Sequence, residues 1–136
     1  MTLQSETSYR SAPPGALLFV LGFAGLSGAA GVALAAVAAH KIESPALATA
    51  ATVLMIHAGA SVGLASVSVH TTQSLRWLII AGVMLAAAAL FSGAVGYHTL
   101  TGSHLFPSAA PIGGSTLIAT WLAVAALAFI EWRSAR

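Results

Sequence analysis

The stretch LFSGAVGYHTLTGSHLFPSAAPIGG, residues 90–114, decides the fold of this chain. It begins inside an apolar run, leaves that run through a Tyr-His pair, and crosses a short polar loop. It then enters a second apolar run at a Pro-Ile-Gly-Gly sequence. A short loop between two long apolar runs predicts two helices that lie side by side and antiparallel.

The composition of the whole chain fits only a membrane protein. Of its 136 residues 58% are hydrophobic and only 6% are charged, whereas soluble domains carry about 25% charged residues. The length allows about four spans of roughly 20 residues and leaves little for an extramembrane domain. Cysteine is absent, which excludes disulfides and cysteine metal sites. The net charge of +2 rests on eight charged residues, so we expect no nucleic-acid partner.

Four apolar runs predict four transmembrane helices, at residues 16–39, 46–69, 75–97 and 112–132. A polar tail, residues 1–15, comes before the transmembrane domain at 16–133, and a basic tail, 134–136, follows it. Pro45 suits the first position of a helix, because its missing N–H would be unpaired there anyway. Pro107 and Pro111 are expected to keep helix out of the last loop.

Short loops between the runs predict an all-α, up-down bundle of four transmembrane helices. With four spans, both termini and the middle loop share one side of the membrane. That side carries four arginines, Arg10, Arg76, Arg133 and Arg136, and the other side carries Lys41. Positive charge favours the cytoplasmic side. We therefore expect both termini in the cytoplasm of a multi-pass protein of the bacterial inner (cytoplasmic) membrane.

Small residues recur along every predicted span and indicate close helix packing. The positions expected to lie in helix seams are Gly22, Gly25, Gly28, Gly31, Gly59, Gly63, Gly93, Gly96, Gly113 and Gly114. Glycine lets helix backbones approach where lipid removes any hydrophobic drive between helices. No strand precedes the first glycine series, so it is not a nucleotide-binding loop. The Pro-Ile-Gly-Gly amides could hold an anion at a helix start, but packing is the favoured interpretation.

Two runs in this part of the chain carry a family resemblance: LFSGAVGYHTLTG and APIGGSTLIATWLAVAAL. They resemble the domain of unknown function 423 family, a group of small four-span membrane proteins. Ala-Ala-His at residues 38–40 and Met-Ile-His-Ala at 55–58 agree with it more loosely, and the first turn lacks the family's two glycines. The resemblance covers most of residues 16–131. It implies a four-span fold and a membrane location, and it supplies no reaction.

His57 is the one ionisable side chain expected deep inside a span, with Ser61 one turn further on. Ionisable groups inside a membrane are rare and suggest function. The structural alternative is a neutral imidazole that hydrogen-bonds to Ser61, to a backbone carbonyl or to a neighbouring helix. We favour that alternative, because a proton path needs partner carboxylates and the spans offer none around His57.

Three further histidines, His40, His98 and His104, are predicted at the outer ends of the helices. Imidazoles from two spans at equal depth could hold haem iron or another metal, and the pair His40 and His98 would suit that arrangement. Interfacial histidines bonded to loops or headgroups are the more frequent case. No bound cofactor is therefore expected, although haem or a metal ion stays an alternative.

The sequence offers no catalytic constellation. Aspartate is absent, and the three glutamates, Glu6, Glu43 and Glu131, are far apart; no Ser-His-Asp set or carboxylate pair can form. We expect a non-enzymatic protein that acts by helix–helix association, as an accessory or stabilising subunit of a larger membrane complex or as a self-associating bundle. Membrane lipid, other transmembrane subunits or a second copy would be its partners. The alternatives are an oligomeric channel or transporter for a small neutral solute, lined by His57, Ser61 and Thr116, and a haem- or metal-binding redox subunit.

Overall fold

The computed structural model describes residues 13–136 and contains four long helices. They are α1 (Pro14–His40), α2 (Pro45–Ser68), α3 (Ser74–Thr101) and α4 (Ala109–Ser134), with no strand in the described range. Each helix is long and apolar enough to cross a membrane. The predicted all-α, four-span fold is therefore confirmed. The predicted polar tail lies largely outside the described residues, and α1 already begins at Pro14.

The helix ends follow local sequence signals. Ser44 caps α2, because its Oγ accepts a hydrogen bond from the Leu47 N–H at 3.3 Å, and Pro45 takes the first helical position as predicted. α3 runs on to Thr101 rather than ending near residue 97, because the first helix-ending residue is Gly102, which adopts the left-handed conformation at φ 72°.

The prediction that Pro111 lies in a non-helical loop is wrong. α4 begins at Ala109, so Pro111 sits in its first turn. The first N–H groups of a helix have no partner inside the helix, so a proline there removes no hydrogen bond. The loop between α3 and α4 is correspondingly short, from Gly102 to Ser108.

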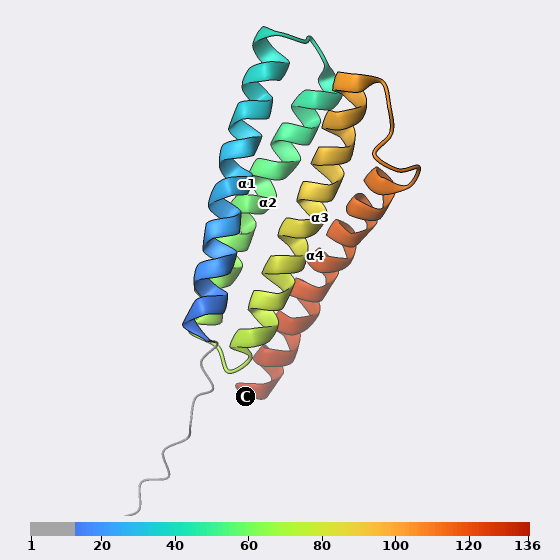
Figure 1. Cartoon of the computed structure of the whole chain (residues 1–136). Helices are drawn as coiled ribbons and strands as arrows, with labels where there is room; N and C mark the ends of the chain where they lie inside the picture. Colours follow the sequence, from blue (N-terminus) through green and yellow to red (C-terminus); the bar gives the residue numbers. More distant parts are fainter. Residues whose placement is uncertain (1–12) are drawn as a thin grey trace, which may run out of the picture.

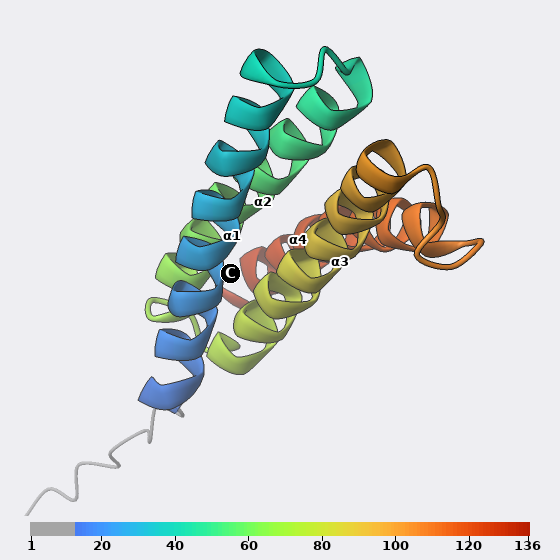
Figure 2. The ribbon, with the colours of Figure 1, turned by 45° about the horizontal axis from the view of Figure 1, so that its top comes forward.

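The helices pack in chain order: α1 on α2, α2 on α3, and α3 on α4 (Figure 1). α1 also touches α3, but among the described residues the backbone of α4 comes close to that of α3 alone. In Figure 2, α1 and α2 run together while α4 lies beyond α3. α1 begins and α4 ends at the same end of the bundle (Figure 1). The molecule is thus a three-helix group with a fourth helix attached to its last member.

α3 is the central helix of the core. Trp77, Met84 and Leu85 are almost fully buried along it. The outer surfaces of α1 and α4 are apolar instead, with Phe19 72% and Leu122 67% exposed. Apolar side chains over the outside of a bundle match a lipid surrounding, because water would not favour them.

Two buried serines join α2 to α3. The Ser92 hydroxyl donates to the Ala50 carbonyl at 2.8 Å, and the Ser61 hydroxyl donates to the Ala81 carbonyl at 3.2 Å. Serine is a common interhelical donor in membranes because it is small and its hydroxyl otherwise lacks a partner in hydrocarbon. These bonds fix how α2 and α3 face each other.

Candidate functional site

His57 lies half-buried on α2 and has a partner at each ring nitrogen. Its Nδ1 lies 2.7 Å from the Val53 carbonyl oxygen, which can only accept, so Nδ1 carries a proton. The Trp121 indole N–H donates to its Nε2 over 3.2 Å. A nitrogen that accepts carries no proton, so these two hydrogen bonds define one tautomer, with the proton on Nδ1. The chemistry is that of a structural hydrogen bond between helices.

The structure does not join His57 to Ser61. The Ser61 side chain is fully buried and donates to Ala81 on α3, whereas His57 turns toward α4. The backbone carbonyl and the neighbouring helix, two of the three partners considered for His57, are the ones it has. Trp121 is 46% exposed. Its bond to His57 links α4 to α2, two helices whose backbones do not come close.

Replacing His57 and Trp121 tests this link. We expect His57→Leu and Trp121→Phe each to lower the free energy of unfolding by about 0.6 kcal/mol, the mean for hydrogen bonds between membrane helices. The double variant should lose less than the sum of the two, because one bond is removed in all three proteins. Unfolding in mixed micelles measures this double-mutant cycle. Strict additivity would contradict the hydrogen bond.

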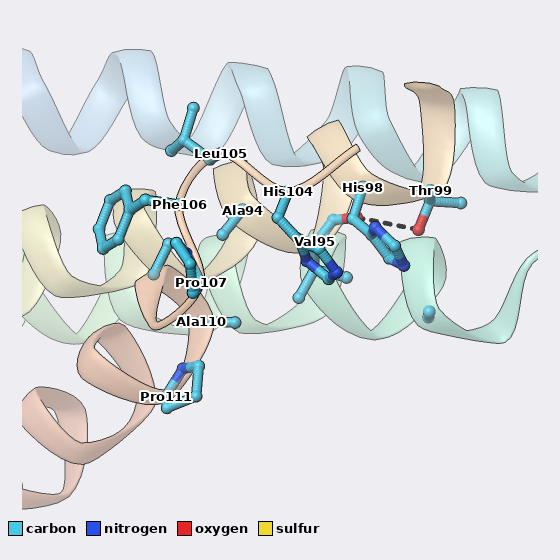
Figure 3. Close-up of a pocket in the computed structure, with 12 residues that line it drawn as sticks. Ala94, Val95, His98, Thr99, His104, Leu105, Phe106, Pro107, Ala110 and Pro111 are labelled. Carbon is cyan, nitrogen blue, oxygen red and sulfur yellow. Dashed lines mark hydrogen bonds between the residues drawn. The ribbon is translucent and has the colours of Figure 1, made fainter. Parts of the chain in front are cut away.

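His98 and His104 form a stacked pair at the other end of the bundle. Their ring centroids are 4.3 Å apart and the ring planes differ by 7°. With Phe106 and Pro107 they line a pocket of about 220 Å³ between the end of α3 and the loop before α4 (Figure 3). His40 is exposed at the end of α1 and is not among the residues that line this pocket.

The stacking bears on the metal hypothesis. An imidazole lone pair lies in the plane of its ring, so two parallel stacked rings do not aim their lone pairs at a common point between them. Within residues 13–136 no group of three or more His, Asp or Glu side chains could hold a metal ion. The stacking partner of His98 is thus His104, and the arrangement expected for a haem shared by His40 and His98 gains no support.

The predicted seam glycines fall into two groups. Five have neighbours within 4 Å of the position that a Cβ would take: Gly28, Gly31, Gly96, Gly113 and Gly114. The other five have none and are exposed on the outside of the chain: Gly22, Gly25, Gly59, Gly63 and Gly93. Half of the positions therefore serve no helix seam inside this chain.

Gly113 makes the closest contact of this set with the backbone of a neighbouring helix. A Cβ there would lie 2.7 Å from the Phe91 backbone nitrogen and 2.9 Å from the Ala87 carbonyl oxygen. α4 can therefore approach α3 this closely only because residue 113 has no side chain. The Pro-Ile-Gly-Gly sequence thus contributes Gly113 to the packing of α4 on α3.

A polar pocket at the end where α4 terminates was not predicted. It measures about 240 Å³ and is lined by residues from the turn between α2 and α3 and from the last turns of α4, among them His70, Thr71 and Glu131. The Trp77 indole N–H donates to Glu131 Oε1 at 3.1 Å. The sequence did contain one indication of this pocket, the expected depth of the residues in the membrane. α3 starts and α4 ends on the same side, so Trp77 and Glu131 lie at similar depths.

The fold and these contacts define the class of this protein. It is a multi-pass membrane protein of four helices with mostly apolar outer surfaces. The family model for "Protein of unknown function (DUF423)" matches residues 34–114, more than half of the chain. The chain belongs to this family, and the resemblance inferred from its sequence is confirmed. The matched residues include all of α2, all of α3 with His98, and the loop with His104. No curated protein and no solved structure matches the chain.

Proposed function

We propose that this protein is a non-enzymatic accessory subunit that packs against a transmembrane helix of a larger membrane complex. The observation that carries the proposal is the open glycine pair of α2. Gly59 and Gly63 are one turn apart, both are exposed, and neither has an atom within 4 Å of its would-be Cβ. Glycines spaced in this way are a known contact motif between membrane helices.

Unpartnered glycines are unfavourable unless something uses them. A glycine in a helix interior costs about 1 kcal/mol relative to alanine. At Gly31 and Gly113 this cost is offset by close packing against a neighbouring helix. Gly59 and Gly63 have no such neighbour in the single chain. A partner helix on α2 would supply the missing contact.

The other parts of the proposal follow from charge and side-chain chemistry. The end with Arg76, Arg133 and Arg136 would face the cytoplasm, and the end with Lys41 would face outward. The location would be the bacterial inner membrane. The engaged side chains of His57 and Ser61 favour a structural role for both over a solute path.

Extraction from native membranes with a mild detergent, followed by native electrophoresis and mass spectrometry, tests the proposal. We expect the wild-type chain in a complex of fixed composition. The double variant Gly59→Leu/Gly63→Leu should shift most of the chain to the free form, because two leucines prevent close helix approach.

The matched control places the same bulk on another outward surface. Ala119 and Ala126 are exposed on α4, so Ala119→Leu/Ala126→Leu should leave the complex intact. A wild-type chain recovered only as a free monomer would contradict the proposal. A complex that contains only copies of this chain would replace the accessory role with self-association.

A further inference from the structure

The pocket at the end of α4 is a polar hollow outside the helix seams. The turn between α2 and α3 contributes His70, Thr71 and Thr72, and α4 contributes Glu131 and Ser134. The pocket therefore joins two chain segments that no backbone hydrogen bond connects, and it opens at one end of the bundle, where the helices leave the membrane.

Glu131 brings a negative charge that has no cationic partner among the described residues. It is partly buried and accepts one hydrogen bond, from Trp77. The nearby arginines are directed elsewhere: Arg133 lies over the Phe129 ring and Arg136 over the Trp132 ring, at 5.9 Å and 3.9 Å. No salt bridge to Glu131 occurs within residues 13–136. A partly buried carboxylate with one neutral donor favours a bound cation.

Thr71 supplies an independent observation. Its Oγ1 is buried, and among the described residues it is the one buried side-chain polar atom without a hydrogen-bond partner. Buried hydroxyls are nearly always paired. The Thr71 hydroxyl is closed off from solvent as it stands, so we expect its side chain to turn toward a group bound in the adjacent pocket.

These groups fit a primary ammonium better than a metal ion. An ammonium offers three N–H donors and no acceptor, while the pocket offers a carboxylate oxygen, an imidazole nitrogen of His70 and threonine hydroxyls. A protein metal site usually has three or more His, Asp or Glu ligands, and residues 13–136 contain no such group.

The depth of the pocket identifies the source of the ammonium. Trp132 and the arginines at this end are residue types that mark the headgroup level of a bilayer. We propose that the pocket binds the primary ammonium of an aminophospholipid headgroup, with Glu131 as its counter-ion. The lipid phosphate would then lie near the exposed arginines of the same end, Arg76, Arg133 and Arg136.

Native mass spectrometry of the whole protein tests this, after exchange into micelles that contain equal amounts of phosphatidylethanolamine and phosphatidylcholine. Both lipids are zwitterionic, but the choline nitrogen has no N–H. We expect the wild-type protein to retain phosphatidylethanolamine about tenfold better, since charge-assisted hydrogen bonds distinguish the two. Glu131→Gln should bring this ratio close to one while its amide oxygen still accepts from Trp77.

Two further variants complete the test. Glu43→Gln changes the other described glutamate, which lies in the loop between α1 and α2 at the opposite end, and should keep the wild-type ratio. Thr71→Val preserves shape and should lower the ratio about threefold through loss of one hydrogen bond. A wild-type ratio near one, or an unchanged ratio in a folded Glu131→Gln, would overturn the proposal. If Glu131→Gln does not fold, the proposal would be overturned by a Thr71→Val protein that keeps the wild-type ratio of the two lipids.

Discussion

Gly113→Ala is expected to lower the free energy of unfolding by about 1–3 kcal/mol, the usual cost of overpacking. The added methyl would lie within 3 Å of the Phe91 nitrogen, the Phe91 Cα and the Ala87 oxygen. These are backbone atoms of α3, which cannot rotate away as a side chain could. α4 must therefore shift outward along its seam with α3.

The adjacent residue provides the control. A Cβ on Gly114 would meet only the Phe91 ring, at 3.7 Å, which is ordinary van der Waals contact. Gly114→Ala should leave stability unchanged or raise it by a few tenths of a kcal/mol, up to about 1, through helix propensity. Thermal unfolding of both variants in the same detergent checks the pair. Equal melting temperatures would show that α4 does not approach α3 as closely as described.

Trp77→Ala is expected to have the largest effect, a loss of about 3–5 kcal/mol. Trp77 is only 5% exposed, packs in the core at the start of α3, and donates its indole N–H to Glu131. Removing it leaves a cavity and takes from a partly buried carboxylate its one hydrogen-bond donor within residues 13–136. Because Gly113 and Trp77 hold the two ends of the α3–α4 seam, the variant should also free the end of α4.

Two comparisons separate these contributions. Trp77→Phe keeps an aromatic ring but loses the N–H, so it should cost about 1–2 kcal/mol. Trp132→Ala removes a tryptophan that is 50% exposed at the same end and should cost less than about 1 kcal/mol. Limited proteolysis at the end of α4 measures its release. A Trp77→Ala protein as stable as Trp132→Ala would contradict the assigned packing.

The sequence predicted the spans well because length and hydropathy suffice to define them. Helix ends were less accurate: nothing before Gly102 ends α3, and Pro111 is harmless in a first turn. Both facts depend on which residue begins or ends a helix, and a hydropathy pattern does not resolve this. The family region, with the loop between α3 and α4, was recognisable from its residues alone.

Side-chain partners could not be predicted in the same way. Ser61 was considered for His57 because it is local, whereas the partner found, Trp121, is 64 residues away. Likewise Gly31 faces a helix and Gly59 faces outward, although both occur in glycine-rich stretches. The difference depends on how each helix is rotated about its own axis, and tertiary packing decides that rotation.

The backbone of α4 packs closely against α3 alone, and this has a consequence for biosynthesis. The contacts among α1, α2 and α3 involve no residue of α4. These three helices can therefore finish packing as soon as residue 101 has entered the bilayer. The last helix then needs only a lateral step from the translocon onto an exposed ridge of α3. A chain that stalls before α4 would leave a folded three-helix intermediate with an open docking ridge, which quality-control proteases could recognise as unfinished.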